Sequence, residues 1–190
     1  MAKTRTFIAI TAIDEVHASA TSVIERLRSS TENVKWVEPD NLHWTLQFLG
    51  DLTDVEMAEV CLRTVRAAAQ EEAFTVSARG IGAFPSNERP RILWLGAGEG
   101  GDSIRRLQAR IEQSLSSLGF RGENRQFVPH LTLGRVASRG GSGGPVLAER
   151  LAKLADYDGG TMAVDEVTVY ASELSRDGPA YHILARAPLG

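Results

Sequence analysis

The stretch Leu42–Gly50, with the sequence LHWTLQFLG, decides the fold that we expect for this chain. In a β-strand, side chains alternate between the two faces, so residues two apart point the same way. His43 and Thr45 therefore share one face, whereas Trp44 and its apolar neighbours take the other. The pattern places an imidazole beside a hydroxyl on a strand whose opposite face is anchored in a core.

The same pattern returns in Pro129–Arg135, with the sequence PHLTLGR, where His130 and Thr132 share a face. A single His-x-Thr pattern is weak evidence, because buried polar groups usually do no more than satisfy one another. Two copies at matching places of a repeated unit favour a different interpretation. We expect the two strands to meet across one cleft, where the two histidines do acid–base chemistry.

The elements around the two motifs follow one order, which is strand, helix, His-x-Thr strand, helix, strand. Phe7 precedes His43 by 36 positions, and Trp94 precedes His130 by the same number. We interpret this spacing as an internal duplication. The sequence therefore predicts an α+β protein, a single domain over residues 1–190 made of two pseudo-symmetric lobes. Antiparallel-rich sheets are expected to flank a central cleft, with the helices on the outside.

Apolar periodicity and turn residues predict the other elements. Strands are expected over residues 6–13, 34–37, 74–81, 91–95, 161–171 and 181–187. Helices are expected over residues 15–29, after a capping box at Thr53, after a cap at Asp102 or Ser103, and from Pro145. The buried stripe of the second helix is expected to be Ala58, Cys61, Leu62, Val65, Ala68 and Ala69. The glycine-rich segment Ser138–Gly144 is expected to be a mobile loop.

Composition sets further bounds on the function. The net charge of −3 and the pI of about 5.8 argue against a broad grip on duplex nucleic acid, which needs many phosphate contacts. A local basic cleft is still compatible with this net charge and pI. The single cysteine, Cys61, excludes an internal disulfide and is typical of a reducing compartment, so we expect a cytoplasmic protein. The apolar run Phe7–Ile13 lacks the small-residue cleavage site of a signal peptide, and no run approaches the roughly 20 apolar residues of a membrane span.

Two other kinds of site fit the sequence less well. Zinc takes three or four protein ligands at close spacing, whereas each motif offers one histidine among apolar residues, so we expect no metal and no cofactor. Gly96–Gly101 matches the glycine pattern of dinucleotide sites. Such a site also needs an acidic residue about 20 positions later, and Glu123 lies there in a turn-like segment. Glycine turns are common, so the pattern alone is weak.

Paired histidines suit acid–base catalysis. The imidazole titrates near pH ~6.5, so one ring can be protonated while the other is neutral. One ring then donates a proton to a leaving oxygen, the other takes a proton from water, and the threonine hydroxyls stabilise charge on a phosphorus atom. Strict alternation puts Arg135 on the face opposite His130. A bulge at Gly134 would turn it toward the cleft, where a guanidinium suits a phosphate.

The motifs and their surroundings resemble the two-histidine phosphoesterases, which carry paired His-x-Thr motifs on a duplicated α+β fold. The resemblance is strongest to the bacterial and archaeal RNA 2′,3′-cyclic phosphodiesterases, first described as 2′-5′ RNA ligases. It spans nearly the whole chain. It is carried by residues 5–10, 36–37, 41–46, 48–50, 89–94, 129–135, 169–174 and 178–181.

The resemblance implies metal-independent hydrolysis of RNA 2′,3′-cyclic phosphate ends to 2′-phosphomonoesters. His43 would match the proton donor to the departing 3′ oxygen, and His130 would match the base that activates water. Thr45 and Thr132 would hold the phosphate.

The resemblance also concerns two further residues and the partners. Arg135 aligns with the arginine that follows the family's second motif, and Phe7 would line the nucleoside pocket. The substrate would be an RNA with a 2′,3′-cyclic phosphate end or a small cyclic nucleotide, with no membrane partner, and we expect a monomer. Two alternatives stay open: 2′-5′ RNA ligation, and a non-catalytic RNA- or nucleotide-binding module.

Overall fold

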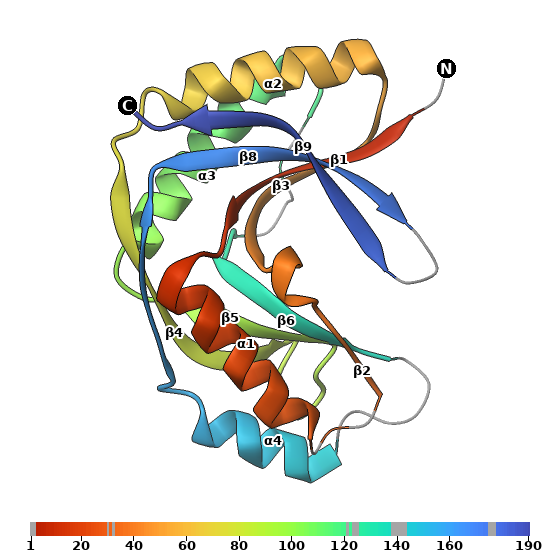
Figure 1. Cartoon of the computed structure of the whole chain (residues 1–190), viewed down its shortest axis with the longest axis vertical. Coiled ribbons are helices and arrows are strands. Elements are labelled where there is room, and N and C mark those ends of the chain that lie inside the picture. Colours follow the sequence, from red (N-terminus) through yellow and green to blue (C-terminus); the bar gives the residue numbers. More distant parts are fainter. Residues whose placement is uncertain are drawn as a thin grey trace.

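The computed structural model of the chain describes residues 3–29, 31, 33–120, 122, 126–137, 144–174 and 178–190. Helices and strands alternate irregularly along the chain (Figure 1), which confirms the predicted α+β class. The elements are β1 (Thr4–Thr11), α1 (Asp14–Arg28), β2 (Val34–Trp36), η1 (Pro39–Asn41), β3 (His43–Leu52), α2 (Asp54–Ala68), β4 (Phe74–Phe84), β5 (Ile92–Ala97), α3 (Gly101–Ser116), β6 (His130–Val136), α4 (Gly144–Lys153), β7 (Asp158–Val164), β8 (Glu166–Leu174) and β9 (Pro179–Pro188).

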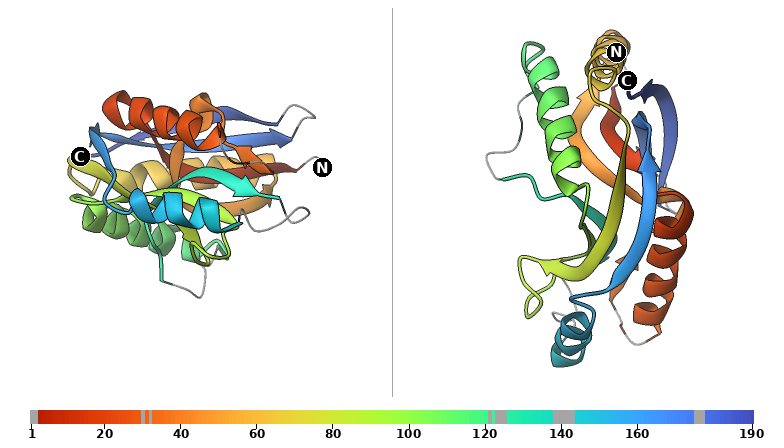
Figure 2. Two further views of the ribbon diagram at one scale, coloured as in Figure 1. Left: turned by 90° about the horizontal axis from the view of Figure 1, so that it is seen from below. Right: turned by 90° about the vertical axis from the view of Figure 1, so that its left-hand side faces the viewer.

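The strands of the described part of the chain form one sheet in the order β7-β4-β5-β6-β3-β1-β8-β9, with β2 paired to β6. Every pairing between them is antiparallel. Figure 2 shows that this sheet is strongly curled. Its two halves meet where β3 joins β6, through the single pair Trp44 and Leu131. The two sheets that the sequence predicts are therefore halves of one sheet, joined at the two His-x-Thr strands.

The helices lie outside the curled sheet (Figure 1), as predicted. Helices α1 and α4 contact the half that contains β7, β4 and β6, whereas α2 and α3 lie against each other and contact β8, β9 and β3. The core lies between the sheet and these helices. It is built from the apolar face of the central strands, where Ile8, Ile10, Trp44 and Leu131 are all buried.

The first and third helices follow the sequence pattern closely. Helix α3 buries Ile104, Leu107, Ile111 and Leu115, and α1 buries Val16, Ala20, Val23, Ile24 and Leu27, apolar residues that recur at helical spacing. The predicted cap of α3 is wrong. Its N-cap is Gly100, which has a φ of 81° and no side-chain cap. A Cβ at Gly100 would lie 2.2 Å from the carbonyl oxygen of Thr75 in β4, so close packing against that strand requires glycine here.

Helix α2 has the predicted capping box at Thr53. The predicted buried stripe is right for Ala68 and partly right for Cys61 and Val65, which are half-buried against the core, and it is wrong for Ala58, Leu62 and Ala69, which are exposed. The buried residues are Val60, Thr64, Ala67 and Ala68, and Leu62 is 55% exposed. The helix packs between α3 and β9. Apolar side chains point to more than one side of this helix, since Val55 and Leu62 are exposed and Val60 is buried, so its rotation is set by these neighbours and not by its own apolar pattern.

Two other predictions concern the second half of the chain. The strand expected over residues 161–171 is two strands, because β7 ends at Val164 and β8 begins at Glu166. The loop expected at Ser138–Gly144 lies outside the described residues, except for Gly144, where α4 begins.

Candidate active site

The pairing of Trp44 with Leu131 brings the two His-x-Thr motifs together, because each is the central residue of its motif. In an antiparallel pair, the residues on either side of a paired position lie opposite one another and share a face. His43 therefore lies beside Thr132, and Thr45 beside His130. The four polar side chains converge on the face of the sheet that is opposite the buried Trp44 and Leu131.

Both motif strands carry one extra residue at the same place, three positions after the histidine. In β3 it is Leu46, because Thr45 and Gln47 pair with consecutive residues of β1. In β6 it is Leu133, because Thr132 and Gly134 pair with Trp94 and Leu93 of β5. Such β-bulges invert the alternation of side chains beyond them.

The bulge in β6 turns Arg135 to the histidine face. Arg135 pairs with Ile92, which lies on the same face of β5 as Trp94, the partner of Thr132. The side chain is exposed, and its charge adds to the effect of burial in lowering the pKa of His43. The sequence suggested Gly134 as the site of this bulge, and the extra residue is its neighbour.

His43 is held by two hydrogen bonds. Its Nδ1 lies 2.7 Å from the carbonyl oxygen of Asn41, and its Nε2 lies 3.0 Å from Oγ1 of Thr45. A carbonyl only accepts, so the proton of the neutral ring is on Nδ1, and Nε2 accepts a hydrogen bond from the Thr45 hydroxyl. The threonine of the motif thus contacts the nitrogen that faces the site.

Burial of His43 lowers its pKa to about 4, chiefly because the imidazolium would lose its hydration. The hydrogen bond to Asn41 opposes this shift, and the positive charges of Arg135 and His130 add to it. The interaction between the two imidazoles places His130 within electrostatic range of His43. In the protein without a bound anion, His43 is therefore neutral at neutral pH.

His130 repeats the arrangement on the second strand. Its Nδ1 lies 2.7 Å from the carbonyl oxygen of Val128, two residues earlier, just as His43 uses the carbonyl of Asn41. The ring of Phe84 in β4 meets the His130 ring edge-on, with centroids 5.0 Å apart at 88°. Both histidines therefore present Nε2 on the side away from their own backbone.

Phe7 lies behind the His43 ring. Its side chain is only 3% exposed, and its ring centroid is 5.0 Å from that of His43. It also stacks on Tyr170 at 5.2 Å and meets Tyr181 at 4.9 Å. Phe7 was expected to line a nucleoside pocket. It lies instead beneath Tyr170 and Tyr181, whose rings line the pocket.

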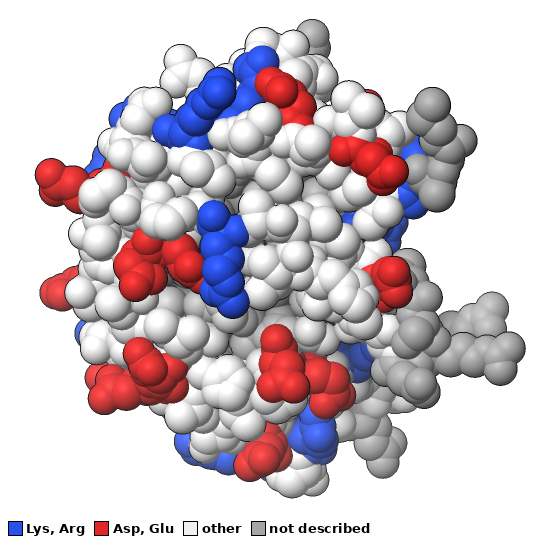
Figure 3. Space-filling view, turned by 45° about the horizontal axis from the view of Figure 1, so that its top comes forward, with Lys and Arg blue, Asp and Glu red and all other residues white. Residues whose placement is uncertain are grey.

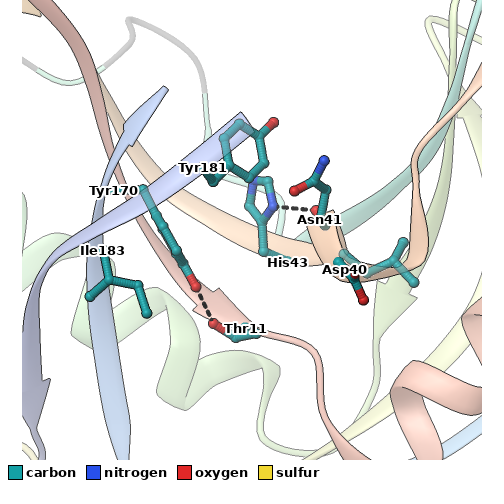
Figure 4. A pocket seen from close by; sticks show the side chains of 8 residues that line it. Thr11, Asp40, Asn41, His43, Tyr170, Tyr181 and Ile183 are labelled. Atoms are coloured by element: carbon teal, nitrogen blue, oxygen red, sulfur yellow. Dashed lines mark hydrogen bonds between the residues drawn. The ribbon is translucent and has the colours of Figure 1, made fainter. Parts of the chain in front are cut away.

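A pocket of about 230 Å³ opens beside His43, and Figure 4 shows it from close by. Tyr181 from β9 stands against the His43 ring, with centroids 5.6 Å apart, and burial raises the pKa of its phenol. The hydroxyl of Tyr170 from β8 is hydrogen-bonded to that of Thr11 at 2.7 Å. The pocket has aromatic walls, and His43 itself and its hydrogen-bond partner Asn41 line it.

A second pocket, of about 440 Å³, lies on the His130 side. It is lined by Val128 and Pro129, which precede His130, and by Gly96, which pairs with it. The indole of Trp94 and the side chains of Arg79 and Arg105 complete the walls. The histidine pair is therefore flanked by a pocket on each side.

Sequence reasoning did not identify Tyr170, Tyr181 and Phe84 as site residues. Tyr170 and Tyr181 come from the last two strands, and Phe84 comes from the end of β4, two strands before the second motif. Their alternation within β-strands is the only local signal, and it does not tell which face of a sheet meets the histidines. The order of the strands supplies that information.

The described residues contain no group of three or more His, Cys, Asp and Glu side chains that could hold a metal ion. The glycine pattern at Gly96–Gly101 has a packing role, since a Cβ at Gly98 would lie 2.6 Å from the Ser77 hydroxyl. Its strand, β5, is antiparallel to both neighbours, unlike the parallel strands of a dinucleotide fold. The acidic partner Glu123 lies outside the described residues.

Charged side chains of both signs are interspersed on the face of the molecule that Figure 3 shows, without a broad basic surface there. In the part of the chain that the structure describes, no helix is long and apolar enough to cross a membrane.

Comparison with known proteins identifies relatives over nearly the whole chain. The model of the family described as "LigT like Phosphoesterase" matches residues 12–94 and again 95–181, so each match contains one motif. The chain is 36% identical to the RNA 2′,3′-cyclic phosphodiesterase of Aeropyrum pernix, covering 85% of this chain and 92% of that protein. It is 35% identical to the protein of that name from Methanothermobacter thermautotrophicus, covering 94% and 95%.

Solved structures agree with this match. A Thermus thermophilus protein superposes with a TM-score of 0.81 at 26% identity, covering 97% of both chains. LigT of E. coli, in a complex with 3′-AMP, superposes with a TM-score of 0.75 at 27% identity, covering 98% of both chains. The chain belongs to the LigT-like phosphoesterase family.

Proposed function

We propose that the protein is an RNA 2′,3′-cyclic phosphodiesterase that yields 2′-phosphomonoesters by acid–base catalysis without a metal ion. The observation that carries the proposal is the pairing of Trp44 with Leu131, which places two imidazoles and two hydroxyls on one face of the sheet. Relatives over nearly the full length are named for this activity.

The histidines take opposite roles in this proposal. His130 takes a proton from a water molecule, whose oxygen bonds to the phosphorus of the cyclic phosphate. The bond from phosphorus to the 3′ oxygen breaks, and His43 donates a proton from Nε2 to that oxygen. The 2′ oxygen keeps the phosphate. The pocket beside His43 accommodates the nucleoside that carries both oxygens.

Bound phosphate stabilises the protonated form that His43 needs in order to donate a proton. In the free protein His43 has a pKa of about 4, so its imidazolium form is scarce at neutral pH. A bound anion beside Nε2 raises this pKa, because it stabilises the protonated ring. The proton donor is thus charged chiefly when substrate is present.

The non-bridging oxygens of the phosphate have three partners in this account. The hydroxyls of Thr45 and Thr132 donate hydrogen bonds, and Arg135 offers a guanidinium on the same face. These donors stabilise the negative charge that develops on the oxygens in the transition state.

The chain itself is proposed to be one domain of two related lobes that share this cleft, in keeping with the two successive matches to one family model. Both histidines come from a single chain, so a monomer suffices for catalysis. The single cysteine, Cys61, fits a reducing cytoplasm.

The product of a defined reaction tests the proposal. A short RNA that ends in a 2′,3′-cyclic phosphate is incubated with the protein in excess EDTA, and 2′- and 3′-phosphate products are separated. We expect full conversion to the 2′-phosphate, at the same rate with and without EDTA. A 3′-phosphate product would mean that the other ester oxygen leaves, and inhibition by EDTA would contradict the metal-free mechanism.

A second candidate activity is 2′-5′ ligation, and the pocket on the His130 side favours it. There an RNA 5′-hydroxyl would replace water as the nucleophile that His130 deprotonates. Supplying a second RNA with a 5′-hydroxyl end in the same assay gives a joined product if ligation occurs. Binding of product without turnover of any cyclic phosphate would instead indicate a non-catalytic nucleotide-binding module.

A further inference from the structure

Phe48 is the one aromatic side chain in the described part of the chain that is mostly exposed to solvent, at 61%. It follows His43 by five positions in β3. Exposing a whole phenyl ring costs free energy, because its apolar surface stays in water. An aromatic ring that is kept exposed beside a candidate active site is thus a candidate contact for a ligand.

The bulge at Leu46 turns Phe48 to the histidine face. Phe48 pairs with Phe7, and Thr45 pairs with Ala9, which is two residues from Phe7 on the same face of β1. Gln47 is turned inward instead and is only 7% exposed. Arg135 takes the matching position in β6, five residues after His130 and beyond an equivalent bulge.

Phe48 is connected to His43 through one intervening aromatic ring. The ring of Phe7 lies between them, with its centroid 6.1 Å from that of Phe48 and 5.0 Å from that of His43. When the phosphate of the terminal nucleotide lies at the histidines, Phe48 is therefore within reach of the preceding nucleotide of the RNA. One site would bind the reacting end and the other the base next to it.

We propose that Phe48 stacks on the base of the nucleotide that precedes the cyclic-phosphate end, an inference that rests on the proposed function. Proteins that bind single-stranded RNA present aromatic rings to unstacked bases in this way, and such stacking tolerates any base because every base has a flat face. The protein then acts on RNA strands of two or more nucleotides in preference to cyclic mononucleotides.

The test compares substrates of two lengths. The readout is the ratio of kcat/KM for a trinucleotide with a 2′,3′-cyclic phosphate end to kcat/KM for a 2′,3′-cyclic mononucleotide. We expect the Phe48→Ala variant to lower this ratio about 10- to 100-fold through KM, the size of one base–aromatic stack. Phe48→Trp keeps the ratio, whereas Phe48→Leu, which is apolar without a ring, lowers it.

A binding measurement completes the test. RNA with 2-aminopurine at the penultimate position and a 2′-phosphate end is titrated with protein, and stacking on Phe48 quenches its fluorescence. Leu62→Ala, which alters an exposed apolar residue of α2, serves as the control and leaves both readouts unchanged. An unchanged ratio and unchanged quenching in Phe48→Ala would overturn the proposal.

The two proposals fail in different ways. A wild-type protein that hydrolyses neither substrate refutes the phosphodiesterase function, and the quenching experiment then still decides whether Phe48 stacks on RNA. A wild-type protein that hydrolyses both substrates with equal kcat/KM retains the function and refutes the stacking.

Discussion

Replacing His130 with alanine is expected to lower kcat/KM for a 2′,3′-cyclic phosphate about 10³-fold or more, the usual scale of general acid–base catalysis. Water would then have to attack without a base to take its proton. The fold should survive, because the ring is partly exposed and is not part of the buried core. Initial rates with a 2′,3′-cyclic mononucleotide, together with the thermal midpoint of unfolding, measure the two effects separately.

The control for His130 is another histidine at the surface. His182 is 58% exposed and pairs with Glu173 at 3.6 Å, outside the candidate site. His182→Ala should keep wild-type rates. Added imidazole should restore part of the activity of His130→Ala, because the adjacent pocket of about 440 Å³ can admit it. A folded His130→Ala protein with more than a tenth of the wild-type rate would refute the base assignment.

Replacing His43 with alanine is expected to lower kcat/KM by about 10³-fold as well, because the departing 3′ oxygen loses its proton donor. The physical setting differs from that of His130. The ring is packed among Phe7 and Tyr181 and held by Asn41, so its removal also leaves a gap between aromatic rings. Rates and unfolding midpoints are therefore needed together.

His43→Gln separates the two effects of that change. Glutamine fills more of the space and can still form hydrogen bonds, but it does not act as a proton donor at neutral pH. We expect it to be nearly as inactive as His43→Ala and closer to the wild type in thermal stability. Activity of His43→Gln within tenfold of the wild type would show that His43 serves the structure and not the chemistry.

The central part of this fold is predictable from sequence for a clear reason. Period-two alternation in Leu42–Leu46 and in Pro129–Leu133 marks both a buried face and a polar face. The polar face carries the only two His-x-Thr patterns of the chain. The apolar stripes of the first and third helices are equally explicit, since branched side chains recur there at helical spacing.

The two β-bulges could not be predicted from the alternation of side chains. Leu46 and Leu133 look like ordinary apolar strand residues, yet each adds one residue and inverts the face of everything beyond it. Arg135 and Phe48 reach the histidine face only for this reason. Gly134 was the residue considered for a bulge in β6, whereas strict alternation placed Arg135 on the opposite face, and the extra residue is Leu133. A bulge is set by how a strand pairs with its neighbour, which local sequence does not encode.

Long-range order explains the other gaps. Tyr170 and Tyr181 reach the site because β8 and β9 add to the free side of β1, far from either motif in sequence. The rotation of α2 likewise depends on α3 and β9, against which it packs. Both features depend on the order of elements in the finished fold.

The dependence of the rate on pH tests the central claim, that His43 and His130 act as one acid–base pair. The measurement is kcat and kcat/KM for a 2′,3′-cyclic mononucleotide between pH 3.5 and 9, a range over which the cyclic phosphate stays a monoanion. The account predicts a bell-shaped profile. His43 must be protonated and His130 neutral, so ionisation of His43 lowers the rate as pH rises, and protonation of His130 lowers it as pH falls. The apparent pKa that belongs to His43 is near 4 in kcat/KM, its value in the free protein, and is higher in kcat because bound phosphate favours the imidazolium. A profile with a single limb, or an apparent pKa of His43 that is the same in both parameters, would contradict the account.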